Sequence, residues 1–202
     1  MPPIDAAIDS FERLVDIFYL PVEYPGLQRF ICYLRDERHA ERLVSALVRR
    51  LQERVPASGM KICALCGLDW SSREALVQSL AAKMADAAPS LAARLPQQEN
   101  GNPRRRVDQR LRALMDPPDA PPDHVLTFVM AVPSEALRED MLLAFAQLRG
   151  LMSASDHNWI IVAPLAITSY GEGSAHQSPF HTLFEMYEVT FDPAYLPDAW
   201  CR

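Results

Sequence analysis

Short apolar runs alternate with amphipathic stretches over residues 60–164. Residues 62–66, 124–132 and 158–164 are nearly uninterrupted apolar runs, and such runs are typical of strands buried on both faces of a parallel sheet. Apolar residues at helical spacing follow the first two runs, at Leu76, Leu80 and Met84 and then at Leu137, Met141, Leu142, Phe145 and Leu148. This alternation of strand and helix predicts a three-layer α/β domain around a parallel sheet.

The region before these strands has a helical pattern. Residues 4–19 place apolar side chains on one helix face, a second helical region starts near Leu27, and residues 40–55 repeat the pattern. The segment Pro56-Ala57-Ser58-Gly59 has the composition of a linker. We therefore expect a helical N-terminal unit of residues 1–56 and an α/β domain of residues 57–202.

The last part of the chain is harder to interpret. Residues 167–179 have the composition of a loop, and residues 187–191 are expected to form a strand. The fold of residues 165–202 is otherwise left open. Between the first two strands, leucines spaced among arginines predict a short basic helix at residues 104–115.

The charge and composition of the chain limit the classes of partner that it can bind. The 202 residues carry a net charge of −6, which disfavours a general nucleic-acid binder. The arginine face of residues 40–55 (Arg42, Arg49, Arg50 and Arg54) is interspersed with Glu41 and Glu53, so it is interpreted as a solvated surface. No apolar run approaches the roughly 20 residues that span a bilayer, and the start of the chain does not resemble a signal peptide. We expect a cytoplasmic protein that binds neither nucleic acid nor membrane.

The cysteines do not predict redox or metal chemistry. Cys63 and Cys66 form a C-x-x-C motif inside the apolar run and before Gly67, whereas a redox cysteine lies exposed at a helix N-terminus. A zinc site requires a second pair of ligands, and the histidines offer only His176 and His181 at a suitable spacing. No metal and no cofactor is expected.

The turn after the first apolar run invites a comparison. A buried strand, a turn that opens a helix, and two later apolar strands resemble the P-loop NTPase arrangement, in particular the STAND-type ATPases of bacterial signalling and defence systems. In that family the turn reads G-x-x-x-x-G-K-[ST] and binds phosphate. When Gly67 takes the first glycine, the other three defining positions fall on Ser72, Arg73 and Glu74. The resemblance is therefore to a degenerate, inactive STAND-like module, and it implies an adaptor; a plain α/β domain unrelated to NTPases would show the same pattern.

Candidate site residues follow from this turn. Gly67, Ser71, Ser72 and Arg73 are the candidates for nucleotide binding, although Asp69 and Ser71 are most simply explained as turn and cap residues. The candidates for a protein interface are the aromatic residue of the turn and a run of three arginines: Trp70, Arg104, Arg105 and Arg106.

Two functional hypotheses remain. The first is a non-catalytic adaptor or regulatory protein that contacts another protein, with self-association left open. The alternative is a nucleotide-binding protein or enzyme with an atypical site at the C-terminal ends of the strands, where ligands of open α/β sheets bind. The residues that follow the three predicted strands there are Asp69, Ser71, Ser72 and Arg73, then Ser134 and Glu135, then Thr168, Ser169 and Tyr170.

Overall fold

The computed structural model describes residues 3–23, 29–55, 61–87, 126–138, 157–166 and 184–201, together with positions 109, 141, 144, 148, 150 and 152. Its helices are α1 (Pro3–Glu23), α2 (Ala40–Arg54) and α3 (Arg73–Ala87). Its strands are β1 (Arg29–Leu34), β2 (Lys61–Leu65), β3 (Leu126–Ala131), β4 (Asn158–Pro164) and β5 (Glu185–Glu188). Short 3-10 helices are η1 (Glu37–His39), η2 (Ser134–Leu137), η4 (Pro193–Tyr195) and η5 (Asp198–Trp200).

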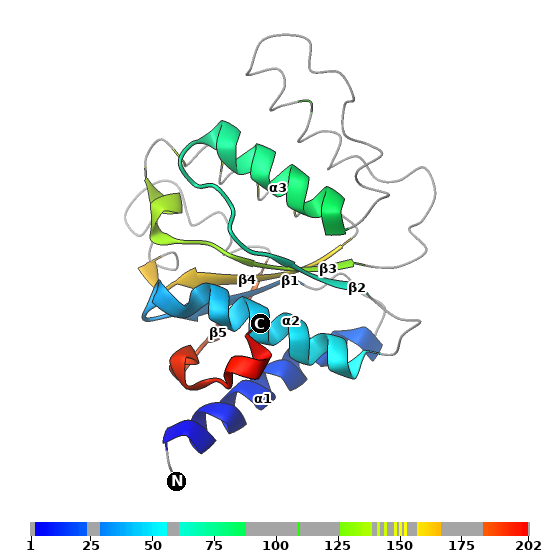
Figure 1. Cartoon of the computed structure of the whole chain (residues 1–202), viewed down its shortest axis with the longest axis vertical. Coiled ribbons are helices and arrows are strands. Elements are labelled where there is room, and N and C mark those ends of the chain that lie inside the picture. Colours follow the sequence, from blue (N-terminus) through cyan, green and yellow to red (C-terminus); the bar gives the residue numbers. More distant parts are fainter. Residues whose placement is uncertain are drawn as a thin grey trace. The chain divides into compact units, whose positions relative to one another are not determined.

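The five strands form one parallel sheet in the order β2-β3-β4-β1-β5. The register between β1 and β4 runs from Arg29 opposite Trp159 to Leu34 opposite Pro164. Within the unit that holds the sheet, α1 and α2 cover it (Figure 1). The prediction of an α/β fold built on a parallel sheet is confirmed.

The strand β1 was not predicted. The sequence pattern favoured a helix beginning near Leu27, but residues 29–34 form a strand between β4 and β5, so that prediction was wrong. The run Arg29-Phe30-Ile31-Cys32-Tyr33-Leu34 is too short for its periodicity to separate helix from strand. Its isoleucine and aromatic residues favour a strand, and pairing on both sides decides the outcome.

The chain divides into two compact units. The first comprises Met1–Cys66, Asp123–Ser134 and His157–Arg202, and the second comprises Gly67–Pro122 and Glu135–Asp156. The whole sheet, α1 and α2 belong to the first unit, and α3 belongs to the second. The boundary expected after residue 56 lies within the first unit, because β1 joins the N-terminal helices to the sheet.

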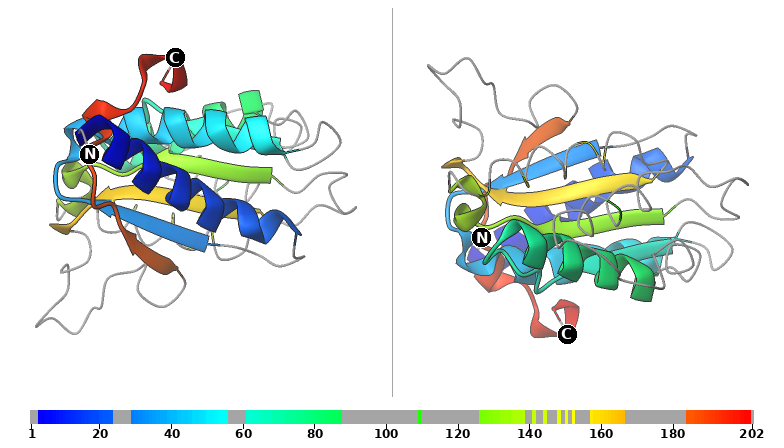
Figure 2. Two further views of the ribbon diagram at one scale, coloured as in Figure 1. Left: turned by 90° about the horizontal axis from the view of Figure 1, so that it is seen from below. Right: turned by 90° about the horizontal axis from the view of Figure 1, so that it is seen from above.

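Helices α1 and α2 lie on the same side of the sheet (Figures 1 and 2). The amphipathic pattern expected for residues 4–19 and 40–55 is confirmed, since the apolar stripe of each helix is buried. Phe11, Leu43 and Leu47 are fully buried in this core. The strands contribute alternate residues to the same cluster: Phe30, Cys32, Leu34, Ile62, Val129, Ile160 and Val162.

The opposite side of the sheet is buried as well. Every residue of β4 is buried, and the rings of Phe128 and Trp159 meet with their centroids 4.9 Å apart. Burial on both faces explains why the sequence of this strand is a continuous apolar run and does not alternate. The strand predicted at residues 158–164 matches β4 at both ends, whereas β5 starts and ends earlier than the strand predicted at residues 187–191.

Arginines on α2 join three segments of the first unit. Arg50 donates to Glu12 of α1 at 2.8 Å and lies over the ring of Trp200, with its guanidinium carbon 4.9 Å from the centroid. Arg54 pairs with Glu12 and Asp16. Arg42 donates to the carbonyl of Pro193 at 3.0 Å and to Asp198 at 2.8 Å, so the segment that contains η4 and η5 is held against α2. Three of the four arginines that were expected to face solvent are therefore structural.

The second unit contains a small apolar cluster of its own. Leu76 of α3 packs with Met141 and Ala144, and Leu68 and Trp70 pack against this cluster. The helix predicted after Gly67 is confirmed as α3. The basic helix predicted at residues 104–115 lies outside the described residues apart from Gln109.

The burial of α2 predicts that a leucine-to-alanine substitution lowers stability much more at Leu47 than at the exposed Leu165. Leu47→Ala should lower the free energy of unfolding by about 2–5 kcal/mol, because it removes a fully buried side chain and leaves a cavity. Leu165 is 42% exposed, so Leu165→Ala makes the same chemical change and should alter stability by only about 0.5 kcal/mol. Urea denaturation followed by circular dichroism measures both. Equal losses would contradict the described core.

Candidate functional site at the carboxyl ends of the strands

The candidate nucleotide-binding residues lie in the turn of residues 67–72 and at the start of α3; this segment is called the β2–α3 turn. Gly67 has φ of +64°, in the left-handed region that glycine adopts without strain. A Cβ atom added at Gly67 would meet no atom within 4 Å. The glycine is therefore required by the backbone conformation, and no close packing demands it.

Two N–H groups of this turn are bonded to acceptors within the turn and the helix. The N–H of Ser71 donates to Asp69 Oδ1 at 2.9 Å, and that of Asp69 donates to Ser79 Oγ at 3.0 Å. Ser72 caps α3, since its Oγ accepts from the N–H of Ala75 at 3.1 Å. A phosphate loop points such donors at its ligand, whereas these donors are directed at their own side chains.

Asp69 places a negative charge at the centre of this turn. Hydrogen bonds from Ser71, through its hydroxyl and its backbone N–H, lower the pKa of the Asp69 carboxyl below its ordinary value. The group is therefore ionised at neutral pH, and it repels phosphate at the place where a P-loop attracts it.

Arg138 holds the turn from outside. Its Nη2 donates to the carbonyls of Trp70 at 3.1 Å and Ser71 at 3.3 Å. The sequence analysis missed Arg138, because no local pattern connects a residue 68 positions away to this turn. Trp70 is half-buried against the cluster around Leu76, which gives this interface candidate a packing role within its own unit.

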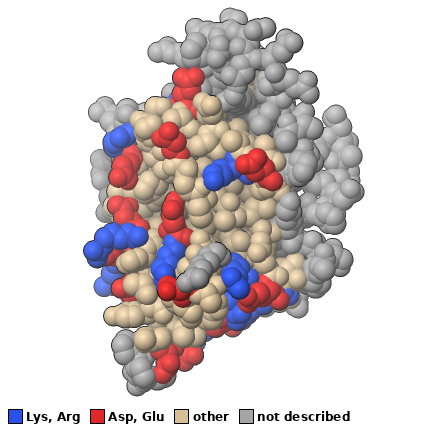
Figure 3. Space-filling model, in the orientation of Figure 1, with Lys and Arg blue, Asp and Glu red and all other residues tan. Residues whose placement is uncertain are grey.

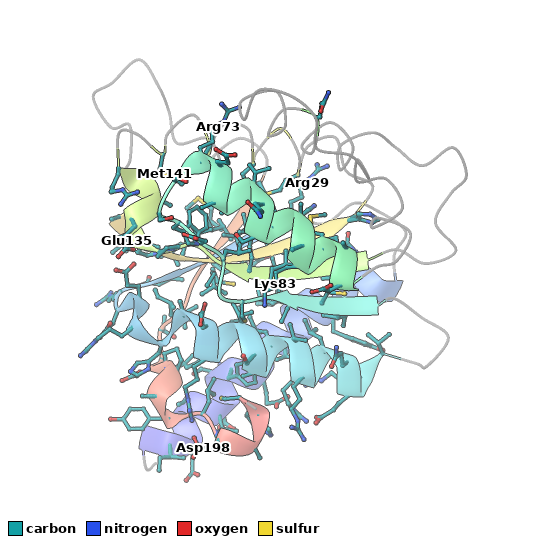
Figure 4. All side chains as sticks on the ribbon, turned by 45° about the horizontal axis from the view of Figure 1, so that its top comes forward. Arg29, Arg73, Lys83, Glu135, Met141 and Asp198 are labelled. Carbon is teal, nitrogen blue, oxygen red and sulfur yellow. The ribbon has the colours of Figure 1, made fainter. Side chains whose placement is uncertain are left out.

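The only described lysine side chain, that of Lys83, lies far from the turn. Figure 4 shows Arg73 at the start of α3 and Lys83 further along the helix. Ten residues of helix separate them by about 15 Å. Glu74 is exposed in the first turn of α3, so the position that would hold the Mg²⁺-binding hydroxyl of a P-loop carries a carboxylate.

The order of the strands points to a different turn. From β1 the chain continues to β2, on the β4 side, and from β4 it continues to β5, on the β1 side. The neighbours β1 and β4 are thus the topological switch point, where ligands of open α/β sheets bind at the carboxyl ends. The strand β2 is an edge strand. The sequence analysis took the β2 run for the first strand of the sheet because it had not recognised β1.

The turn after β1 comprises residues 35–39 and is called the switch-point turn. Residues 35–42 read Arg-Asp-Glu-Arg-His-Ala-Glu-Arg and contain no glycine, lysine, serine or threonine. Asp36 caps η1 by accepting from the N–H of Arg38 at 3.1 Å, and it accepts from Arg38 Nε at 2.9 Å. These hydrogen bonds, the side-chain ones first, lower the pKa of Asp36 to about 2.

Glu37 joins the switch-point turn to the start of η2. Its Oε2 accepts from the backbone N–H of Ser134 at 2.7 Å and from the Ser134 hydroxyl at 2.8 Å. Ser134, which follows the strand predicted at residues 124–132, is a donor to a carboxylate 97 residues earlier in the chain. Two carboxylates therefore occupy the backbone donors at the carboxyl ends of β1 and β3.

A cavity of about 330 Å³ opens beside the switch-point turn, lined by Leu34, Arg35, Asp36, Glu188, Val189, Thr190, Phe191, Asp192 and Pro193. Its charged groups are bonded to one another or to backbone. Arg35 donates to Glu188 Oε1 through Nη2 at 3.0 Å, and Asp192 caps η4 by accepting from the N–H of Ala194 at 2.9 Å.

Several candidates cannot be placed together. Arg104, Arg105, Arg106, Thr168, Ser169 and Tyr170 lie outside the described residues. Glu135 is exposed, and Figure 4 labels it at η2. Their proposed roles stay predictions.

The described residues form no metal-binding cluster, no disulfide at Cys63 or Cys66, and no helix that could span a membrane. Within the described ranges, no three histidine, cysteine, aspartate or glutamate side chains gather as they would around a metal ion. Cys63 is buried in β2, Cys66 is half-buried after it, and neither forms a disulfide. None of the described helices combines the length and the apolarity that crossing a bilayer requires.

Charges of both signs are mixed on the visible surface. Figure 3 shows arginine and lysine side chains interspersed with aspartate and glutamate on the face it presents. Arg42, Arg50 and Arg54 are already paired with carboxylates, so they do not form an open basic stripe of the kind that binds nucleic acid.

Comparison with known proteins bears on the fold. No protein-family model matches the chain, and no curated protein gives a significant match. Among solved structures, the chain is similar to a chain of the "Structure of Drosophila ORC bound to GC-rich DNA and Cdc6", with a TM-score of 0.54 and 14% sequence identity. The fold is P-loop-like. The similarity, to a structural neighbour in the AAA+ P-loop family, covers 94% of this chain and 29% of that chain.

The contact between Arg38 and Asp36 predicts a titration shift. The pKa of Asp36 should be about 2 in the folded protein, and Arg38→Ala should raise it part of the way toward the ordinary 3.8, because the side-chain hydrogen bonds to the ionised form are lost while the backbone N–H of residue 38 still donates. Because the folded pKa is depressed, the contact favours folding above about pH 4, and this contribution is lost as the pH falls through the folded value. NMR titration of the carboxyl carbon measures the shift. An Asp36 pKa that does not respond to Arg38→Ala would contradict the contact.

Proposed function

We propose that this chain is a non-catalytic adaptor or regulatory protein with a P-loop-like fold, acting through contacts with other proteins. The resemblance to STAND-type ATPases suggests a bacterial defence or signalling system as its setting. No cofactor is required by this proposal.

One observation carries the proposal. At the switch point, where a fold of this kind would bind its ligand, the carboxylates of Asp36 and Glu37 accept backbone N–H groups of Arg38 and Ser134. A bound phosphate would need the same kind of donor and would lie beside two negative charges. The Coulomb energy between such charges is unfavourable at about 4 Å even in water, by about 1 kcal/mol per pair.

The β2–α3 turn supports the same proposal independently. The N–H groups of Asp69 and Ser71 are bonded to Ser79 and Asp69, and that of Ala75 is bonded to Ser72. A nucleotide would have to displace these internal bonds before it gained any of its own, and each displaced bond reduces the net gain.

The role in protein contacts rests on the remaining surface. A domain of this size that binds no nucleotide retains its helices and sheet edges as recognition surfaces. The structural neighbour is described as bound to DNA and to Cdc6, which are contacts of that protein. For this chain, the net charge of −6 favours a protein partner over DNA.

A nucleotide-binding protein or enzyme with an atypical site is the alternative. Gly67 in the left-handed conformation before α3, followed by Arg73 in the first helical turn, is the observation that favours it. A helix N-terminus attracts anions, and an arginine there would add a charge-assisted contact.

Calorimetric titration with nucleotides separates the two functions. MgATP, MgADP and MgGTP titrated separately into the full chain should release no heat of binding up to millimolar ligand, which corresponds to a binding free energy weaker than about −4 kcal/mol. Binding by the wild type would contradict the proposal.

Two matched variants then locate the ligand. Loss of binding in Arg73→Ala alone would assign it to the β2–α3 turn and support the alternative. Loss in Arg35→Ala alone would assign it to the switch-point turn. The two substitutions remove the same side chain from turns at the ends of different strands, so each serves as the control for the other.

A further inference from the structure

The outer edge of β2 offers backbone groups to another strand. In the described part of the chain, β2 has a neighbouring strand on one side only, because the sheet order places it at the edge. Gln52 of α2 donates from Nε2 to the carbonyl of Ile62 at 2.8 Å, which shows that this carbonyl faces away from β3. Since backbone groups alternate along a strand, Ala64 faces the same way. Exposed edges of this kind are sites of strand addition.

A groove of about 560 Å³ runs beside this edge. Val48 of α2 and Ala64 of β2 supply its apolar part, and Arg49 and Glu53 stand at its rim. Ala64 is exposed although it lies in the middle of a strand whose neighbours Cys63 and Leu65 are buried. The small side chain leaves room for another backbone to approach.

The charges at the rim are self-complementary. Arg49 and Glu53 lie one helical turn apart, and Arg49 Nε is 3.3 Å from Glu53 Oε1. The two side chains are 46% and 42% exposed. When two copies of α2 lie antiparallel around a two-fold axis near residue 51, Arg49 of each copy faces Glu53 of the other. An isologous contact requires this reciprocity.

The contacts between α2 and β2 show which residue of the strand lies beside the proposed axis on the helix. Gln52 bonds to Ile62, and Val48 lines the groove with Ala64. Four residues of helix and two residues of strand both span about 6 Å. An axis near residue 51 of α2 therefore passes close to residue 63 of β2, where antiparallel pairing sets Ile62 opposite Ala64 of the second copy.

The other edge of the sheet does not share this property. The strand β5 (Glu185–Glu188) carries two glutamates and no arginine or lysine of its own, and Glu188 is bonded to Arg35 outside the strand. It therefore lacks a reciprocal pair of opposite charges like that of Arg49 and Glu53, which favours β2 as the edge for a second copy.

We propose that two copies of this chain associate through antiparallel β2 edges, with their α2 helices side by side and Arg49 of each facing Glu53 of the other. The inference goes beyond the proposed function and does not depend on it, since it uses only α2 and β2. The Ile62 carbonyl has a second lone pair, so it can accept from the second copy while Gln52 remains in place.

Sedimentation equilibrium of the full chain tests the proposal with charge reversals. The wild type should form a dimer with a micromolar dissociation constant. Arg49→Glu places glutamate opposite glutamate and should raise that constant by about tenfold or more, as should Glu53→Arg. The double variant restores opposite charges and should regain the wild-type constant. Ala64→Arg, which fills the groove, should also raise the constant.

Mixing the two single variants tests the reciprocal charge contact most directly. Arg49→Glu carries two negative groups at the rim and Glu53→Arg carries two positive ones, so the mixture should form a heterodimer although neither variant dimerises well alone. Arg13→Glu changes the charge equally on the exposed face of α1 and should leave the constant unchanged. Thermal unfolding of each variant confirms that it is folded.

Three results would overturn the proposal. A wild type that stays monomeric at hundreds of micromolar would exclude the dimer, and binding of an extended peptide by such a monomer would assign the edge to a different partner. A dimer that tolerates both charge reversals and Ala64→Arg would place the interface elsewhere. A mixture of the single variants that stays monomeric would remove the reciprocal contact.

Discussion

The position of β1 inside the sheet is the constraint on which the rest of this structure depends. A parallel strand has to be paired along its edges and covered on both faces, and β1 meets this requirement between β4 and β5. Its position makes the switch-point turn the natural place for a ligand. The residues there, Asp36 and Glu37, use their carboxylates to complete the local hydrogen bonding. Backbone N–H groups at the carboxyl ends of β1 and β3 are thus bonded to side chains of the protein itself.

The helix α2 has charged residues on two sides, one toward α1 and one toward the edge of the sheet. Toward α1 and the segment of residues 191–201, its arginines are half-buried and paired, so they hold the first unit together. Toward the edge of the sheet, Arg49 is paired only within its own helix. A paired arginine that is half-buried contributes more to structure than an exposed one, since solvent screens the exposed pair. The two sides of the helix are linked by Glu53, which pairs with Arg49 toward the edge and with Arg50 toward α1.

The sequence allowed much of the fold to be predicted, for physical reasons that differ between elements. The run of β4 is nearly uninterrupted because both of its faces are buried, the runs of β2 and β3 are similarly apolar, and this signal is local. The strand β1 was missed because the five apolar or aromatic residues after Arg29 fit either periodicity. The bounds of β5 were predicted too late in the chain because Glu185 and Glu188 interrupt its apolar character. Asp69 and Ser72 could be recognised as turn and cap residues from their type alone. Glu37 and Arg138 could not, since their partners lie far away in the chain and only the folded backbone brings them together.

The aromatic contact at Trp200 has a consequence for the order of folding. Its ring stacks on Phe11 with centroids 5.4 Å apart, and β1 pairs with β4 and β5, which come more than a hundred residues later in the chain. Contacts between such distant residues give a high contact order, and forming them costs loop-closure entropy before they stabilise anything. During synthesis, both edges of β1 stay without their partner strands until β4 and β5 have been made, so the centre of the sheet cannot assemble before most of the chain has left the ribosome.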